Sequence, residues 1–261
     1  MLHNSQNVNI YLQTKKEKAL SKAFFFIYFF CLSYVFNGDY MRKIFCFLVV
    51  VCVCITFAFF VTVVKGRATE KEFLFGEVVY VDAGHGGKDN GASFSGVLED
   101  EINLKIAGYV IGLLIDLGAY VLTSRTGDYD LSNIYDKNKK RQDLINRVSQ
   151  INEGKVDLFV SIHLNSFSSS SVSGAQVFSQ TNDQSKSLAG LMQERLNILM
   201  NRDKKVKTGD YYILNKTNRT GVLVECGFLS NEIERNLLLK SEYQQKIAKS
   251  VVLGIVDYFK N

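Results

Sequence analysis

The fold is decided by the stretch VVYVDAGHGG at residues 78–87. Its first half is a compact apolar run rich in β-branched residues, which is typical of a buried strand. Its second half is rich in glycine, so the strand is expected to end in a tight loop that carries His85. Residues 99–117 follow with apolar side chains at helical spacing, and Gly118 stands where a glycine commonly ends a helix. This order predicts a strand, a loop and a helix, the unit from which parallel sheets are built.

The same alternation continues to the end of the chain. Further strands are expected at residues 119–124, 156–163, 174–179, 211–214 and 221–225, and further helices at 143–151, 184–200 and 243–259. Strands that alternate with helices predict an α/β fold with a largely parallel sheet. The sequence shows no internal repeat, so residues 77–261 are expected to form one domain.

The charge and the cysteines are unevenly distributed. Residues 1–70 hold 8 of the 31 Lys and Arg and 3 of the 26 Asp and Glu, so the rest of the chain carries 23 of each. A nucleic-acid-binding protein would carry positive charge on its folded domain, so this class of function is disfavoured. Residues 71–261 have one cysteine, Cys226, which excludes a disulfide framework or a cysteine zinc cluster in that part of the chain. A metal site would need histidine and carboxylate ligands.

A membrane anchor is expected near the N-terminus. Residues 44–64 form a run of 21 residues without a charged side chain, and about 20 such residues cross a bilayer. The run is long for a cleavable signal peptide, so an uncleaved anchor is favoured. A second apolar stretch, at 23–36, has 14 residues, which is marginal for a span.

These features predict four segments. Residues 1–43 would be an N-terminal tail, or an extension produced by a gene prediction that starts too far upstream. Residues 44–64 would be a transmembrane signal-anchor. Residues 65–76 would be a linker to the domain at 77–261. With a single pass through the cell membrane and basic residues before it, the domain would lie outside the cell, on the cell-wall side.

Two histidines occupy equivalent positions in the predicted sheet. The chain has three histidines, and His3 lies in the N-terminal tail. His85 and His163 each follow an apolar strand, and ligands of open α/β sheets bind at the carboxyl ends of the strands. One histidine there is more often a structural residue, but two in equivalent positions indicate a site. Neutral imidazole is a good ligand for Zn²⁺, and catalytic zinc usually has three protein ligands.

The third ligand would be a carboxylate. Glu99, Asp100 and Glu101 open the helix that follows the His85 loop. Acidic residues in a first helical turn also simply complement the helix dipole. The spacing slightly favours Glu99, which shares a helix stripe with the core-facing Ile106, but the pattern leaves the choice open.

Other polar residues lie at the same predicted edge. Glu225 ends an apolar strand, where a charge is costly unless it is paired, so it is interpreted either as a general base or as an ion-paired carboxylate. Cys226 is interpreted as a small buried residue, because no histidine is left to activate it. Arg125 is expected to hold a substrate carboxylate or carbonyl, or to form a structural ion pair. Asn165 is expected to orient a ligand or to bind substrate. Arg147 is assigned to a helix with an exposed, charged face.

With these positions in order, the chain resembles the zinc-dependent N-acetylmuramoyl-L-alanine amidases over about residues 77–260. The resemblance rests on five motifs: VVYVDAGHGGKDNGA, GVLEDEINLKIA, YVLTSR, DLFVSIHLNS and GVLVECGFLSNEIE. It implies that His85, Glu99 and His163 hold one Zn²⁺ per chain and that Glu225 is the catalytic glutamate. The family glutamate precedes a polar pair and then hydrophobic-Asn-Leu, which places Glu99 at the ligand position.

The resemblance also implies a fold and a reaction. The fold would be a three-layer α/β/α arrangement around a mixed, mostly parallel sheet. The reaction would be hydrolysis of the amide bond between N-acetylmuramic acid and L-alanine in peptidoglycan, by a monomeric catalytic domain. The segment SSVSGAQVFSQ and the charged stretch before DLINRVSQIN are similar to the spore-cortex type, which removes stem peptides so that muramic lactam can form.

Some features depart from the family, and other functions stay open. The family usually has proline where this chain has Ala83, Asn90 and Gly221, and proline stiffens a loop, so looser loops are expected. A zinc peptidase or deacetylase would use the same ligands. A non-catalytic wall-binding protein would be expected to lose a ligand or Glu225. A purely structural membrane protein is the least favoured alternative.

Overall fold

The computed structural model describes residues 43, 47–57 and 73–261, and the chain divides into two units, Met1–Gly66 and Arg67–Asn261. In the first unit, the described residues 43 and 47–57 are helical. Over the described residues, no helix combines the length and the apolar character that crossing a bilayer requires.

The predicted single-pass anchor and the predicted location at the cell membrane are therefore corrected. The finding that overturns them is that no helix among the described residues is both long enough and apolar enough to span a membrane. The rest of the predicted anchor, at 44–46 and 58–64, lies outside the described residues, as do nearly all of the predicted tail and most of the predicted linker.

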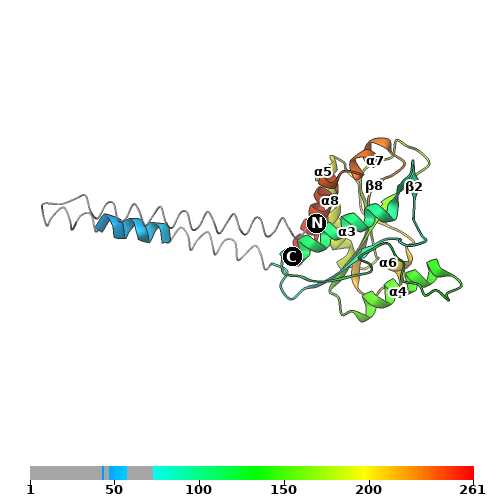
Figure 1. Ribbon diagram of the computed structural model, residues 1–261, viewed down its shortest axis with the longest axis horizontal. Coiled ribbons are helices and arrows are strands. Elements are labelled where there is room, and N and C mark those ends of the chain that lie inside the picture. The colour runs from blue at the N-terminus through cyan, green and yellow to red at the C-terminus, as the bar shows by residue number, and fades with distance from the viewer. Residues whose placement is uncertain (1–42, 44–46, 58–72) are drawn as a thin grey trace. The chain divides into compact units, whose positions relative to one another are not determined.

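The second unit is built around a six-stranded sheet (Figure 1). In spatial order its strands are β4 (Tyr120–Thr123), β1 (Val78–Ala83), β5 (Leu158–Asn165), β8 (Thr220–Phe228), β6 (Gln176–Ser179) and β7 (Lys207–Thr208). All neighbouring pairs are parallel except β8 and β6, which are antiparallel. The predicted mixed, mostly parallel sheet is confirmed. A separate hairpin joins β2 (Ser93–Phe94) to β3 (Val97–Leu98).

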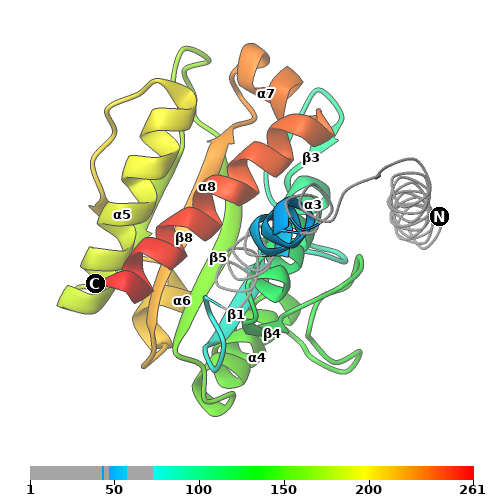
Figure 2. The same ribbon diagram turned by 90° about the vertical axis from the view of Figure 1, so that its left-hand side faces the viewer.

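Helices cover both faces of the sheet (Figure 2). One face carries α3 (Glu99–Asp116), α5 (Asp183–Met200) and α8 (Ser241–Lys260). The other face carries α4 (Lys139–Glu153) and α6 (Tyr212–Lys216), and the short α7 (Glu232–Leu238) follows β8. The unit therefore has three layers.

Successive side chains of a strand alternate between two hydrophobic cores, one on each face of the sheet. Val79 and Val81 of β1 belong to the core under α3, α5 and α8. Tyr80, between them, belongs with Phe159 of β5 to the core under α4 and α6. Side chains alternate between the two faces of a strand, so a strand that is covered on both faces is apolar throughout. This explains the continuous apolar runs in the sequence.

Most predicted elements are confirmed, and one is wrong. Gly118 ends α3 in a left-handed conformation, with φ of 89°. The strand predicted at 211–214 is instead the start of α6, in which Ile213 and Leu214 are buried in the second core. Periodicity does not distinguish a strand from a helix in so short an apolar run. The hydroxyl of Thr217 donates to the carbonyl of Ile213 (2.7 Å) and closes this short helix.

Candidate functional site

The two histidines meet where β1 and β5 end. These strands are parallel neighbours, so His163 of β5 lies beside the loop that follows β1. The rings of His85 and His163 contact each other edge to face, with centroids 4.9 Å apart. A Cβ atom on Gly84 would lie 2.2 Å from the His163 ring, so only glycine lets the loop approach this closely. His85 itself has φ of 61°, an uncommon left-handed conformation.

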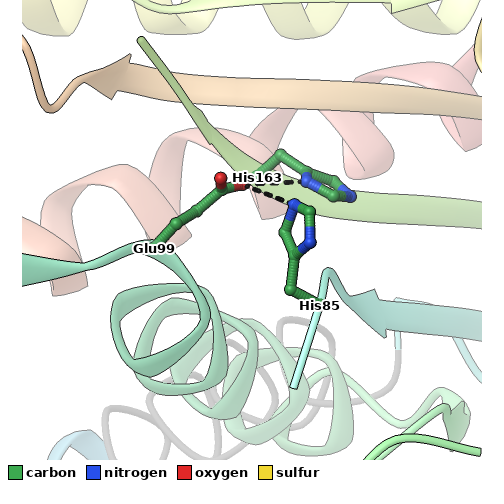
Figure 3. Close-up of side chains that lie close together, drawn as sticks. All are labelled: His85, Glu99 and His163. Carbon is green, nitrogen blue, oxygen red and sulfur yellow. Dashed lines mark hydrogen bonds and ion pairs between the residues drawn. The ribbon is translucent and has the colours of Figure 1, made fainter. Parts of the chain in front are cut away.

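Glu99 completes the cluster from the first turn of α3 (Figure 3). Its Oε1 lies 3.0 Å from Nδ1 of His163 and 3.3 Å from Nε2 of His85. Its two oxygens also accept hydrogen bonds from the backbone N–H groups of Leu164 (3.1 Å) and Ala92 (2.8 Å). One ligand atom from each of the three side chains lies within 4.8 Å of the others. Of the three acidic residues left open by the pattern, Glu99 is therefore the one that joins the histidines.

The charges of the cluster favour a cation. Burial acts to raise the pKa of Glu99, but its hydrogen bonds and charge interactions with the two histidines hold that pKa well below its usual range. Burial acts to lower the pKa of His85, but Glu99 and Asp89 raise it to about 9. A buried carboxylate that attracts positive charge between two imidazoles fits a divalent metal. The set of two nitrogens and one oxygen matches the three protein ligands of a catalytic zinc.

A second carboxylate lies next to this cluster. Glu225 of β8 is the direct register partner of His163 in β5, and its side chain is buried. Its Oε1 accepts a hydrogen bond from the hydroxyl of Tyr211 (3.3 Å), whereas its Oε2 has no partner among the described residues. Burial raises the pKa of Glu225 to about 6; His163 opposes this effect and Glu99 adds to it. A free carboxylate oxygen with a pKa close to neutrality is suited to a general base.

The neighbouring cysteine takes no part in this arrangement. Cys226 is fully buried, and burial raises the pKa of its thiol. A thiol that is buried and protonated is a poor nucleophile. The structure agrees with its interpretation as a small core residue.

The ring of His85 is oriented by a pair that the sequence did not single out. Its Nδ1 lies 2.9 Å from Oδ2 of Asp89, and the same oxygen lies 3.1 Å from Nζ of Lys140. Metal-binding histidines commonly donate their second N–H to a carboxylate in this way, which fixes the tautomer and the ring orientation. Nε2 of His85 is then the nitrogen left to face Glu99.

Two buried ion pairs of Arg147 support the loop that carries His85. Arg147 of α4 is 1% exposed, forms ion pairs with Asp82 and Asp143, and donates to the carbonyl of His85 (2.7 Å). Burial acts to raise the pKa of Asp82, but Arg147 lowers it to about 2. The assignment of Arg147 to an exposed face is thus wrong. Asp82 could have indicated this burial from the sequence, because a carboxylate at the end of a buried strand needs a cationic partner.

Arg125 has a similar structural role. It is 1% exposed and donates to the backbone carbonyls of Ala83 (2.9 Å), Gly84 (3.0 Å), Asp100 (2.8 Å) and Gly127 (3.0 Å). These contacts tie the His85 loop to the start of α3. Neither expected role, a substrate contact or an ion pair, matches them.

Asn165 ends β5, two residues after His163, and is half-buried. Its carbonyl accepts a hydrogen bond from the N–H of Leu229 (2.8 Å), and the pairing with β8 is irregular between His163 and Asn165. Asn165 therefore lies at the same edge of the sheet as His163, at the carboxyl end of β5.

Two of the three positions that depart from the proline pattern, Ala83 and Gly221, use their N–H groups as hydrogen-bond donors. Ala83 donates to the hydroxyl of Ser124 (3.1 Å), and Gly221 donates to the hydroxyl of Ser185 (3.0 Å). A Cβ atom on Gly221 would lie 2.0 Å from the ring of Phe159. Proline has no N–H to donate. Hydrogen bonds therefore hold these two segments where the family pattern has proline, contrary to the expected looseness.

Comparisons with known proteins agree with this geometry. The family model described as N-acetylmuramoyl-L-alanine amidase matches residues 79–257. A germination-specific N-acetylmuramoyl-L-alanine amidase of Bacillus subtilis (strain 168) is 38% identical over 192 residues, which are 71% of this chain and 81% of the relative.

Solved structures that are similar in fold and sequence include two amidases. The amidase CwlD of Clostridioides difficile, solved in complex with the GerS lipoprotein, has a TM-score of 0.67 and 37% identity, covering 71% of this chain and 99% of that one. The catalytic domain of the amidase CwlV of Bacillus (Paenibacillus) polymyxa has a TM-score of 0.63 and 30% identity, covering 70% and 98%.

Proposed function

The chain belongs to the N-acetylmuramoyl-L-alanine amidase family, whose members hydrolyse peptidoglycan, and we propose that His85, Glu99 and His163 hold one Zn²⁺ for this reaction. The observation that carries the proposal is the convergence of these three side chains within 4.8 Å. Three separate stretches of chain supply them, and this family is generally zinc-dependent. We also propose that residues 77–261 act as a monomeric catalytic domain on the glycan strand and its stem peptide.

The roles of the other residues follow from their places. When bound by this cluster, Zn²⁺ would polarise the amide carbonyl and make a water molecule more acidic. Glu225 takes a proton from the attacking water through its free Oε2 and delivers it to the departing alanine nitrogen. Asp89 holds the ring of His85, and Asn165 contacts the substrate at the edge of β5. Arg125 holds the loop and has no substrate contact in this scheme.

The alternatives are less well supported. A peptidase or deacetylase would need the same ligands, but the family match favours cleavage of the muramoyl–alanine amide. A non-catalytic wall-binding protein would have no reason to retain Glu225 with a free, buried oxygen beside the ligand cluster.

We further propose the spore-cortex type of this activity, in which stem-peptide removal leads to muramic lactam. The support is the similarity to the germination-specific amidase of Bacillus subtilis and to CwlD. Because CwlD was solved with a lipoprotein, a lipoprotein is a candidate partner here as well. Deletion of the gene is expected to remove muramic lactam from the cortex, and an unchanged cortex would exclude this subtype.

The activity is tested with the purified full-length protein, loaded with zinc, on peptidoglycan. Mass spectrometry is expected to find free stem peptides that begin with L-alanine, together with intact glycan. The control is the Glu225→Ala variant, which should bind zinc but release no stem peptides. Deacetylated glycan, or peptides cut elsewhere with the muramoyl–alanine bond intact, would contradict the proposed reaction.

A further inference from the structure

One side chain that touches Glu225 has no part in the scheme above. The hydroxyl of Tyr211 donates to Oε1 of Glu225 (3.3 Å), while Oε2 is buried without a partner among the described residues. The contact is longer than the usual 2.5–3.0 Å of an O–H···O hydrogen bond. Catalytic hydrogen bonds are often long before a ligand binds and tighten in the complex. The two oxygens of Glu225 are therefore already unequal.

The position of Tyr211 is fixed by its surroundings. Its ring packs edge to face on Phe178 of β6, with centroids 4.9 Å apart. A Cβ atom on Gly209 would lie 2.5 Å from the Tyr211 ring, so a glycine is required there for the ring to fit. On the other side Tyr211 opens α6, which is anchored by the buried Ile213 and Leu214. The ring is held while its hydroxyl reaches Glu225.

The chemistry of the hydroxyl permits one kind of contact with an ionised carboxylate. Burial and the charge of Glu225 raise the pKa of Tyr211, so the phenol keeps its proton and acts as a donor. The terminal torsion of a glutamate is broad, so the plane of its carboxylate turns easily unless one oxygen is bound. A single fixed donor on one oxygen holds that plane and leaves the other oxygen free.

We propose that Tyr211 is a positioning residue for the reaction: by binding Oε1 it directs Oε2 of Glu225 toward the water that attacks the amide. The inference rests on the proposed role of Glu225 as the base. It deepens that role, because the efficiency of the proton transfer then depends on a residue from the loop between β7 and α6.

The test compares Tyr211→Phe with Tyr212→Phe in the zinc-loaded full-length protein. Tyr211→Phe removes one oxygen and retains the ring that packs on Phe178. We expect kcat to fall about tenfold, which is the effect of losing one hydrogen bond to a charged group, with KM and zinc affinity unchanged. The neighbouring Tyr212→Phe should behave as the parent protein. Phe178→Leu loosens the packing of the Tyr211 ring but keeps its hydroxyl, so it should give a smaller loss of kcat. This variant replaces Tyr211→Phe in the test if Tyr211→Phe is unstable.

A double variant separates positioning from direct contact. In a Glu225→Gln background, Tyr211→Phe should change the residual rate less than about twofold, because the residue through which it acts is already altered. A full tenfold loss in that background, a rise in KM alone, or a parent-like kcat for both Tyr211→Phe and Phe178→Leu would each overturn the inference. These results differ from failure of the proposed function, in which the parent protein itself would release no stem peptide.

Discussion

His163 and Glu225 are direct partners in the parallel register of β5 and β8. Neighbouring strands lie about 4.8 Å apart, and paired residues present their side chains to the same face of the sheet. The proposed ligand and the proposed base are thus spaced by the backbone hydrogen bonds of the central strands and not by a loop. Substitutions at either position can therefore change the chemistry while the sheet stays intact.

Replacement of the base should separate metal binding from turnover. Glu225→Gln keeps the shape of the side chain but cannot accept the proton, so kcat should fall about 10²–10⁴-fold. Zinc content, measured by atomic emission, should stay near one per chain. The exposed Glu153→Gln is the matched control and should keep full activity. A Glu225→Gln variant with parent-like activity would remove Glu225 from the mechanism.

Loss of a ligand should remove the metal. His163→Ala deletes one of three converging side chains, so the purified variant should contain little zinc and no activity. In the parent protein, a chelator should abolish activity, and added zinc should restore it. Because zinc binds the folded state, its addition should also raise the melting temperature of the parent but not of the variant. Equal zinc content in both proteins would argue against the proposed site.

The Gly84 position offers a purely steric test. A Cβ atom at Gly84 would lie 2.2 Å from the ring of His163, so Gly84→Ala should displace the ring and weaken zinc binding. Gly108→Ala in α3 is the control, because its Cβ would meet nothing within 4 Å. Alanine is favoured over glycine in a helix by roughly 0.5–1 kcal/mol, so this control should be at least as stable as the parent. Isothermal titration with zinc distinguishes the two variants.

The carboxylate that orients His85 should matter for metal affinity. Asp89→Asn removes the charge that faces Nδ1 of His85 and the ammonium of Lys140, and should weaken zinc binding about 10–100-fold. Lys140→Met, which leaves Asp89 in place, should have a smaller effect. An unchanged affinity in Asp89→Asn would show that the His85 ring is oriented without this contact.

The acid limb of the pH profile should report Glu225. Its pKa is raised to about 6 by burial, and zinc in the neighbouring cluster would add positive charge and lower it. The base works only when ionised, so kcat/KM should fall as the pH decreases through a value at or below about 6. The limb should be lost from the residual activity of Glu225→Gln. A limb that persists unchanged in that variant would belong to another group.

Much of the fold and of the site could be predicted from the sequence, because both depend on local pattern. The apolar runs that end in His85, His163 and Glu225 encode strands covered on both faces, and their parallel arrangement alone brings their ends together. Glu99 was fixed by resemblance, since helix position alone did not separate it from its two acidic neighbours.

What could not be predicted depends on tertiary contacts. Burial of Arg147 follows from its pairing with Asp82, which lies 65 positions earlier in the chain, and the side-chain pattern of one helix cannot reveal it. The role of Arg125 depends on backbone carbonyls, which every residue has. Tyr211 was assigned to a strand, although it opens a short helix whose packing decides its conformation.

The two buried arginines have a consequence for how the enzyme matures. Arg125 and Arg147 fasten the carbonyls of Ala83, Gly84 and His85 through contacts that involve no metal. Side chains of the protein itself therefore hold the loop that carries the first proposed ligand. We therefore expect the metal-free protein to fold first and to bind zinc afterwards, as a receptor whose ligand loop is already in place.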